Sequence, residues 1–311
     1  MNTPKWIGEE EVRERLPMPK LIDLMAETLA SFSTAQVEQP VRTVVEVASD
    51  AFFGVMPALI RTTPALGAKL VTVFGSNIAK GLPTHLATIL LLDPATGALL
   101  TVMDGRYITE ARTAAVSAVS TRYMAREDAA VLALIGSGVQ AHSHLEALTL
   151  VRNFREIRCW SPTRSNLDRF VAEHPQVQPA DSAQAAVAGA DVIALVTAST
   201  TPVIQNEWVQ DGTHVIAVGA CRPTHREIDP KLVARARLIV DSRAAALKES
   251  GDVVLAIQEG LFGPEHIKGE LGEVVSGSCK GRDNTTQVTI FKSLGLACED
   301  VAAADLVFDL I

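Results

Sequence analysis

The sequence lacks several features that would place it in other protein classes. Aromatic residues make up only 5%, and none of its four cysteines forms a Cys-x-x-Cys pair, so neither a zinc ribbon nor a disulfide framework is indicated. The 28 Lys and Arg residues are outnumbered by 36 Asp and Glu residues, which makes the chain a poor candidate for binding duplex nucleic acid, because phosphate binding requires a basic face. No run of about 18 uncharged apolar residues predicts a membrane span, and no apolar signal core follows Met1, so we expect a cytoplasmic protein.

What is present is 311 residues, 48% hydrophobic and 21% charged, which is enough for two folded domains. The first third combines an amphipathic helix over 19–32, where apolar residues recur at helical spacing, with several short strands and a helix from about 108 to 124. The turn from Asp93 to Gly97 predicts a hairpin. The expected strands are 43–47, 51–56, 68–74, 87–92 and 98–103. This part is predicted to be α+β with a mainly antiparallel sheet.

Beyond about Asp128, buried strands alternate with helices, which is typical of a parallel sheet covered on both faces. We therefore expect an α/β fold, a Rossmann-type doubly wound parallel sheet, joined to the first α+β domain. The stretch 288–311 is predicted to be helical and to pack back on that first domain. Expected strands are 129–135, 156–160, 191–197, 214–218 and 238–240, and expected helices are 166–172 and 182–188.

The strongest local motif is a glycine loop that follows an apolar strand and opens a helix. It has the pattern Gly-x-Gly-x-x-Ala and reads Gly136-Ser137-Gly138-Val139-Gln140-Ala141. The first glycine permits a tight turn, the second lets a pyrophosphate approach the backbone, and the alanine lets the helix pack closely on the strand. Free N–H groups and the dipole at the helix N-terminus favour phosphate. The motif predicts dinucleotide binding.

The end of the next strand bears on which dinucleotide is bound. An NAD site usually carries an acidic residue there for the ribose 2′-hydroxyl. Here the stretch 159–165 has no acid, and Arg164 could meet a 2′-phosphate, with Ser161 and Thr163 as hydroxyl donors. NADPH is therefore favoured, with NADH as a possible second cofactor, because Arg164 could instead be a solvated helix residue.

At this point the sequence resembles the ornithine cyclodeaminase/mu-crystallin family, and most closely its mu-crystallin-like imine reductase branch. The resemblance extends over nearly the whole chain, and the matching segments are specific only together. They are 39–45, 67–71, 82–85, 102–105, 108–115, the glycine loop, 217–220, 246–252 and 289–295.

The resemblance implies a homodimer whose chain has a substrate-binding and dimerisation domain, residues 1–120 and 294–311, and a dinucleotide-binding domain, residues 121–293. It also implies that Arg42, Lys69 and Arg112 hold a substrate carboxylate. Physical chemistry supports this clamp, because cations in apolar surroundings are costly unless an anion meets them. Arginine binds a carboxylate through two parallel N–H bonds, whereas lysine acts as a point charge.

One position separates the chemistries within this family. Ornithine cyclodeaminases and the related alanine dehydrogenases resemble one another in carrying an Asp just after Val-Gly-Gly or Val-Gly-Ala, where it handles the substrate amine. This sequence has Cys221 there, in Val218-Gly219-Ala220-Cys221. The substitution disfavours cyclodeamination, which needs a base and a second contact to the amine, and leaves reduction of a preformed cyclic imine, which needs much less.

The resemblance thus implies NAD(P)H-dependent reduction of Δ1-pyrroline-2-carboxylate or Δ1-piperideine-2-carboxylate to L-proline or L-pipecolate. The substrate would enter between the domains, with Lys69 or a bound water as proton donor to the imine. Substrate contacts are expected from Arg42, Lys69, Thr84, His85, Arg112 and Cys221. The remaining expected cofactor contacts are Thr113, Thr197, Ala220, Lys292, Ser293 and Leu294.

Two rival interpretations stay open at this point: a cyclodeaminase or alanine dehydrogenase-like enzyme, and a non-catalytic small-ligand binder like mu-crystallin. Asp241, Glu249 and Asp252 could contact a substrate amine or order their loop. His142 and His144 lie two residues apart on a predicted helix and do not share a face, so no metal site is expected from that pair.

Overall fold

The computed structural model describes residues 4–310, and the chain divides into two compact units. Unit 1 comprises Met1–Arg112 and Gly295–Ile311, and unit 2 comprises Thr113–Leu294. The first boundary falls inside the long helix α3 (Arg106–Met124), which contributes residues to both units. Within residues 4–310, no helix combines the length and the apolar character needed to cross a membrane.

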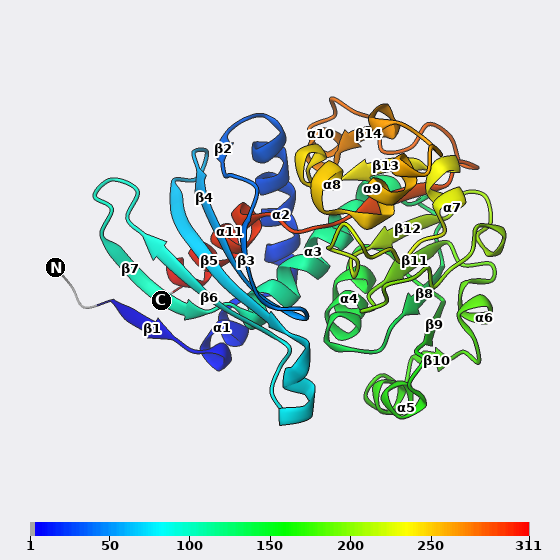
Figure 1. Cartoon of the computed structure of the whole chain (residues 1–311), viewed down its shortest axis with the longest axis horizontal. Coiled ribbons are helices and arrows are strands. Elements are labelled where there is room, and N and C mark those ends of the chain that lie inside the picture. Colours follow the sequence, from blue (N-terminus) through cyan, green and yellow to red (C-terminus); the bar gives the residue numbers. More distant parts are fainter. Residues whose placement is uncertain (1–3, 311) are drawn as a thin grey trace. The chain divides into compact units, whose positions relative to one another are not determined.

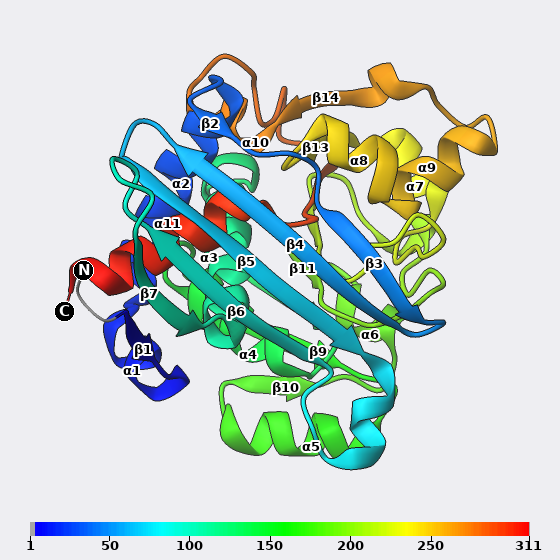
Figure 2. The same ribbon diagram turned by 60° about the vertical axis from the view of Figure 1, so that its left-hand side comes forward.

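Unit 1 is built on a seven-stranded sheet, mainly antiparallel as predicted, in the order β1-β7-β6-β5-β4-β2, with β3 also paired to β4 (Figure 2). The predicted hairpin around Asp93–Gly97 joins β6 to β7. The short β1, which the sequence did not reveal, pairs in parallel with β7. The elements are β1 (Lys5–Ile7), α1 (Glu9–Arg15), α2 (Met18–Ser33), β2 (Val37–Glu38), β3 (Thr43–Ala48), β4 (Ala51–Ile60), β5 (Ala65–Phe74), η1 (Gly75–Lys80), β6 (His85–Leu92) and β7 (Leu99–Asp104).

The core of unit 1 lies between this sheet and two helices, α2 and α11 (Ala297–Asp309), which contact each other (Figure 1). On α2, Leu21, Met25 and Leu29 are fully buried, at the helical spacing seen in the sequence. Alternate residues of β5 are buried and half-buried, as expected for a sheet with one covered face. Lys69 occupies a buried position of this alternation, so a cation lies on the core face of the strand.

Unit 2 contains an eight-stranded sheet in which every neighbouring pair is parallel, in the order β10-β9-β8-β11-β12-β15-β13-β14. From β8 the chain moves outward in both directions, so right-handed crossovers place helices on opposite faces, which confirms the doubly wound fold. The elements are β8 (Val131–Ile135), α4 (Val139–Thr149), β9 (Glu156–Trp160), α5 (Arg164–Glu173), β10 (Val177–Pro179), α6 (Ala183–Val187), β11 (Val192–Leu195), η2 (Asn206–Trp208), β12 (His214–Ala217), α7 (Pro230–Arg235), β13 (Arg237–Val240), α8 (Arg243–Glu249), α9 (Gly251–Gln258), η3 (Pro264–His266), β14 (Ile267–Glu270), α10 (Leu271–Val275) and β15 (Thr289–Lys292).

The prediction of a helix over 288–311 is partly wrong. Residues Thr289–Lys292 form β15, a fully buried strand between β12 and β13, and the helix α11 begins only at Ala297. A four-residue buried strand carries no period of its own, so periodicity cannot distinguish it from part of a helix. As predicted, α11 packs on the first part of the chain, against β4, β5 and β6. Ile311 lies outside the described residues.

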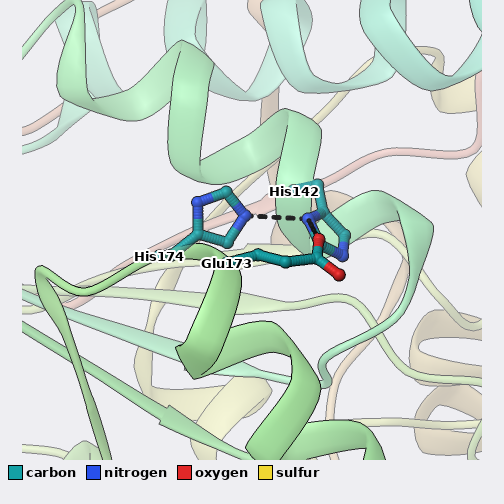
Figure 3. A group of neighbouring side chains, drawn as sticks. All are labelled: His142, Glu173 and His174. Atoms are coloured by element: carbon teal, nitrogen blue, oxygen red, sulfur yellow. Dashed lines mark hydrogen bonds and ion pairs between the residues drawn. The ribbon is translucent and has the colours of Figure 1, made fainter.

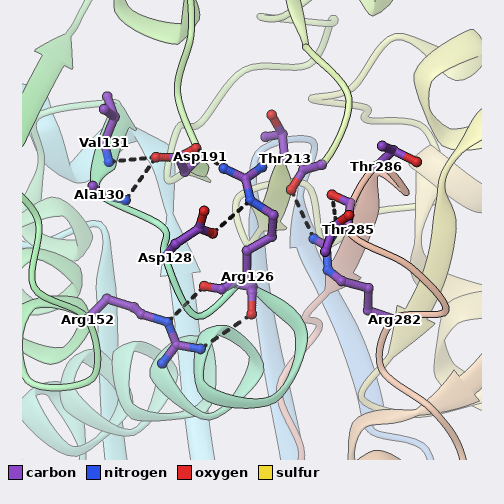
Figure 4. A network of polar contacts seen from close by, with 12 residues as sticks. Arg126, Asp128, Ala130, Val131, Arg152, Asp191, Thr213, Arg282, Thr285 and Thr286 are labelled. Carbon is purple, nitrogen blue, oxygen red and sulfur yellow. Dashed lines mark hydrogen bonds and ion pairs between the residues drawn. The ribbon is translucent and has the colours of Figure 1, made fainter.

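In unit 2 an arginine network fixes the start of β8, the strand that leads to the glycine loop (Figure 4). Arg126 donates to Asp128 and Asp191, and Asp191 also accepts from the backbone N–H groups of Ala130 and Val131, at 2.8 and 3.0 Å. The same carboxylate precedes β11, so one side chain aligns the beginnings of two neighbouring strands. The carboxyl ends of these two strands meet beside the glycine loop.

Candidate active site

In unit 1, Lys69 and Arg112 meet on a shared carboxylate. The Nζ of Lys69 lies 2.5 Å from Oδ2 of Asp300, and the Nε of Arg112 donates to Oδ1 of Asp300 at 3.0 Å. Arg112 also donates to Oε2 of Glu299 at 2.5 Å. All four side chains are buried, and the two acids come from the first turn of α11. The apolar surroundings that the sequence indicated for these cations are therefore real, but two acids that it did not reveal share the site.

Arg42 contributes a third cation to this group. It lies just before β3 and donates to the carbonyl of Gly295 at 3.1 Å, which joins it to the residue that leads into α11. Arg42 also lies close enough to Lys69 for its charge to lower the pKa of that lysine. Among these five side chains, three cations, Arg42, Lys69 and Arg112, accompany two carboxylates, those of Glu299 and Asp300. This excess of one positive charge favours a further anion.

The charges in this cluster shift each other's titration. Burial lowers the pKa of Lys69 to about 8; Asp300 opposes this effect, whereas Arg112 and Arg42 reinforce it. Burial alone would raise the pKa of Asp300, but Arg112 and Lys69 hold it below its usual value. Burial, with Lys69 and Arg112, lowers the pKa of His85 to about 4, so its imidazole is neutral near pH 7. The preceding residue, Thr84, is half-buried.

In unit 2 the glycine loop has the predicted strand–turn–helix setting. Gly136 directly follows β8 with φ +112°, and a Cβ there would lie 2.6 Å from the carbonyl oxygen of Val196, so only glycine fits the turn. Gly138 is the N-cap of α4 and provides no side-chain cap, while a Cβ there would meet nothing within 4 Å. Gly138 and Val139 are exposed. The first N–H groups of α4 are therefore open to an anion, and the loop fits a dinucleotide phosphate.

The loop opens where the strand order of the sheet reverses, between β8 and β11. Ligands of doubly wound sheets bind in the crevice at the carboxyl ends of the strands at such a switch point. Ser137 is buried and Gln140 half-buried within the loop and the first turn of α4. Thr197, half-buried, follows the end of β11. The structure thus brings these predicted cofactor residues to one edge of the sheet in unit 2.

The predicted 2′-phosphate residues lie at the carboxyl end of β9. Ser161 directly follows the strand, Thr163 is the N-cap of α5, and Arg164 is its first residue. Thr163 and Arg164 are exposed, and the Nε of Arg164 donates to Asp168 one turn along the same helix at 2.8 Å. Arg164 is accessible to an anionic ligand, which would compete with Asp168 for it.

A buried acid that the sequence did not single out, Glu227, holds two of the loops at this edge. Its Oε1 accepts from the backbone and the hydroxyl of Thr197 at 3.0 and 2.7 Å, and its Oε2 accepts from the backbone N–H groups of Gly219 and Ala220 at 2.6 and 3.1 Å. A Cβ at Gly219 would lie 1.9 Å from the carbonyl oxygen of Thr197, so these loops approach too closely for a side chain there. Burial raises the pKa of Glu227 to about 7, although Lys292 opposes this effect.

A second group of buried charges surrounds the end of β15. The Nζ of Lys292 lies 3.2 Å from Oδ2 of Asp252, whose Oδ1 accepts from the backbone of Glu227 and Ile228. Asp241 accepts from the backbone N–H groups of Ser242 and Leu294. The sequence left two roles open for these acids, contact with a substrate amine or ordering of a loop. In the structure, Asp241 and Asp252 accept hydrogen bonds from loop backbone, which is the ordering role.

Three further predicted residues have other surroundings. Cys221 is exposed, and its thiol donates to the carbonyl of Val218 at 3.2 Å. Thr113 and Ser293 are buried, the former within α3 and the latter directly after β15.

An open phosphate-binding loop at the switch point of a doubly wound sheet is typical of a dinucleotide-dependent enzyme, and the cationic cluster of unit 1 suits an anionic substrate. The family model described as "Ornithine cyclodeaminase/mu-crystallin family" matches residues 6–311, and the chain belongs to this family.

Known proteins of this family resemble the chain over nearly its whole length. It is 46% identical to ketimine reductase mu-crystallin of Rattus norvegicus over 98% of this chain and 97% of that protein. A solved structure of the Δ1-pyrroline-2-carboxylate reductase of Thermococcus litoralis, in complex with NADH and L-proline, superposes with a TM-score of 0.95 at 35% identity, covering 98% of this chain and 96% of the other. An archaeal alanine dehydrogenase dimer with bound NAD superposes with a TM-score of 0.93 at 32% identity, covering 98% and 95%.

Proposed function

We propose that this enzyme reduces cyclic imine-2-carboxylates with NAD(P)H, converting Δ1-pyrroline-2-carboxylate to L-proline or Δ1-piperideine-2-carboxylate to L-pipecolate. It is an oxidoreductase acting on CH–NH groups. The observation that carries the choice of substrate class is the cluster of Arg42, Lys69 and Arg112 in unit 1, with its single excess positive charge. One substrate carboxylate completes that charge balance. The relatives named for ketimine and pyrroline-2-carboxylate reduction support the same chemistry.

We assign the substrate to unit 1 and the dinucleotide to unit 2. The guanidinium groups of Arg42 and Arg112 would hold the two carboxylate oxygens, because arginine offers paired donors, and Lys69 would add its charge. Glu299 and Asp300 hold Arg112 and Lys69 in place before substrate arrives. Holding the carboxylate in this way orients the imine carbon, and orientation alone can supply a large part of the rate enhancement. When bound, NAD(P)H supplies the hydride.

Lys69 is our candidate for the proton that the imine nitrogen receives. Its pKa of about 8 lies close to neutral pH, which is where a general acid works best. His85 is a poor candidate, since its pKa of about 4 leaves it without a proton to give at pH 7. A water held near Lys69 is the rival donor. Thr84 and His85 would then contribute to the wall of the imine pocket.

For the cofactor, we propose a preference for NADPH. Its support is the exposed Arg164 at the carboxyl end of β9, with Ser161 and Thr163 beside it and no acid in 159–165 to receive a ribose hydroxyl. The two relatives described above hold NADH or NAD in their solved structures, so the affinity of this enzyme for NADPH should be compared with its affinity for NADH.

We further propose a homodimer. Strand β3 of unit 1 exposes Val44, Val45 and Val47, whose exposed fractions are 50, 53 and 56%. A strand with exposed valines is an aggregation hazard unless another chain covers it. A second copy is the occupant we favour, in line with the dimeric alanine dehydrogenase relative.

The test measures oxidation of NADPH or NADH by the purified protein, with each cyclic imine and without imine. The loss of absorbance of the reduced nicotinamide reports the reaction. Rapid cofactor oxidation with either imine alone establishes the reductase, and the product is identified as L-proline or L-pipecolate. Ornithine with NAD runs in parallel. Ammonia release from ornithine would mean that Cys221, in place of an acid, is no barrier to cyclodeamination. Tight NADPH binding with no turnover of either imine would overturn the proposal in favour of a ligand-binding role.

A further inference from the structure

Three potential metal ligands that are not among the proposed cofactor contacts converge from two helices of unit 2 (Figure 3). His142 lies in the second turn of α4, Glu173 is the last residue of α5, and His174 is its C-cap. The Nδ1 of His142 is 2.8 Å from Nε2 of His174 and 3.7 Å from Oε2 of Glu173. The three ligand atoms lie within 4.8 Å of one another.

We propose that His142, Glu173 and His174 form a site for one divalent transition-metal ion, with Zn²⁺ as the representative ion. Two imidazoles and one carboxylate suit Zn²⁺, Ni²⁺ or Cu²⁺, whereas Mg²⁺ and Ca²⁺ prefer all-oxygen sites. Since Zn–N bonds are about 2.0–2.1 Å, two nitrogens on one tetrahedral ion lie about 3.3 Å apart. The two imidazole nitrogens share a hydrogen bond at 2.8 Å, so the rings would have to move apart by about 0.5 Å to hold the ion. Glu173 would need only a modest side-chain rotation, and a water would complete four-fold coordination.

Packing holds the two imidazoles in this arrangement. The ring of Phe170, itself buried, contacts both, with centroid distances of 4.8 Å to His142 and 4.7 Å to His174. A site whose ligands are already positioned loses little side-chain freedom on binding the ion. Glu173 is more than half exposed, so an ion can reach the site from solvent.

The neighbouring His144 is not part of this site. It is fully buried and bonds Ser117 Oγ at 2.9 Å and the carbonyl of Gln140 at 2.7 Å. The second imidazole comes instead from the end of the next helix, which the spacing of residues within α4 could not reveal. The proposed ion would tie α4, which begins at the glycine loop, to the end of α5.

The test is a calorimetric titration of the metal-stripped full-length protein with Zn²⁺. We expect one saturable site and a higher unfolding temperature with the ion bound, because a ligand that binds only the folded state stabilises it. His142→Ala and His174→Ala should each weaken Zn²⁺ binding at least about 100-fold, and Glu173→Gln about tenfold. His266→Ala, at a half-buried histidine of unit 2 bonded to the carbonyl of Val233, is the matched control and should leave the affinity unchanged.

Co²⁺ is a second probe, which distinguishes binding at this site from binding at cysteine thiols. Its spectrum can be recorded on the wild-type protein, so the result does not depend on whether a variant folds. Cobalt bound by nitrogen and oxygen gives visible bands without the near-ultraviolet charge-transfer band of a cobalt thiolate. Cys221→Ser and Cys279→Ser should leave both spectrum and affinity unchanged. Absence of saturable Zn²⁺ binding, retention of full affinity in both histidine variants, or a thiolate band would each overturn the proposal.

Discussion

The Nζ of Lys69 lies 2.5 Å from Oδ2 of Asp300, and both side chains are almost wholly buried. Lys69 is on the core face of β5, and Asp300 is in the first turn of α11, which the chain reaches only after completing unit 2. A lone cation on the covered face of a sheet would be strongly unfavourable. Asp300 offsets part of that cost, although burial still lowers the pKa of Lys69, and the last helix of the chain thereby completes the cationic cluster of unit 1.

The pH dependence of the reaction should report on Lys69. Because its pKa is about 8, it loses its proton as the pH rises through that value, and with it both its charge and its role as proton donor. For the cyclic imine, kcat/KM should therefore fall above about pH 8. In Lys69→Arg the guanidinium stays charged at high pH. In this variant KM should therefore no longer rise above about pH 8. The measurement is kcat and KM against pH for both proteins.

The imine substrate also titrates, but its contribution is common to both enzymes and cancels in the comparison. Lys69→Met supplies the matched uncharged control, with a KM raised at every pH. Identical pH profiles for the wild type and Lys69→Arg would show that Lys69 neither binds the carboxylate nor donates the proton.

Asp300→Asn should destabilise the protein strongly. Removing one partner of a buried ion pair leaves the other charge uncompensated, at a typical cost of about 3–5 kcal/mol. Asp305→Asn is the control on the same helix. Burial, with Asp309 nearby, raises the pKa of Asp305 to about 6, so neutralising it should be neutral or stabilising at pH 7. Urea unfolding measures the free energy of unfolding of both variants. An equal decrease in that free energy for Asp300→Asn and Asp305→Asn would contradict the role given to Asp300.

The sequence revealed those parts of the site that have a local pattern. The glycine loop stands out because its small residues follow a strand and open a helix, and Lys69, which the family resemblance singles out, is supported by its position in an otherwise apolar strand. These patterns belong to one segment each, so they can be recognised without knowing what the segment packs against. The antiparallel and parallel sheets were predictable for the same reason.

The partners of these residues have no such local pattern. Glu299 and Asp300 lie in the first turn of an ordinary helix, where acidic residues are common, and nothing near them in sequence indicates that they meet Arg112. Glu227 lies in a loop, and its four hydrogen bonds go to backbone and hydroxyl groups of two other loops. Such contacts depend on the tertiary fold, which periodicity does not describe. The strand β15 was missed because it is too short to show a period.

Glu227→Gln should change the pH dependence of stability in a defined direction. The folded pKa of Glu227 is about 7, above its ordinary value of 4.5, so the folded state binds this proton more tightly than the unfolded chain. Its contribution to stability is present below pH 4.5 and is lost as the pH rises through 7, by up to about 3 kcal/mol. The difference in free energy of unfolding between the variant and the wild type, measured from pH 5 to 8, should therefore move in favour of the variant as the pH rises.

The comparison with wild type is necessary because buried histidines act in the opposite direction. Burial lowers the pKa of His144 to about 4 and that of His214 to about 3, so these groups favour the folded state as the pH rises toward neutrality. They are unchanged in Glu227→Gln and cancel in the difference. A pH-independent difference would mean that Glu227 keeps an ordinary pKa in the folded protein.

Arg164 should determine how well the enzyme distinguishes NADPH from NADH. Arg164→Ala is expected to weaken NADPH binding by about 1.5–3 kcal/mol, the usual value of a hydrogen bond to a charged group, and to leave NADH binding nearly unchanged. Asp168→Asn should do the reverse and strengthen NADPH binding, because Asp168 holds the Nε of Arg164 at 2.8 Å when no phosphate is bound.

Arg169→Ala, at another residue of α5 that bonds Asn166, is the matched control for lost positive charge. Fluorescence titration with both cofactors gives the four pairs of dissociation constants. A parallel loss of NADPH and NADH affinity in Arg164→Ala would show that Arg164 does not read the 2′-phosphate, and an equal loss of NADPH affinity in Arg169→Ala would reduce its effect to general electrostatic attraction.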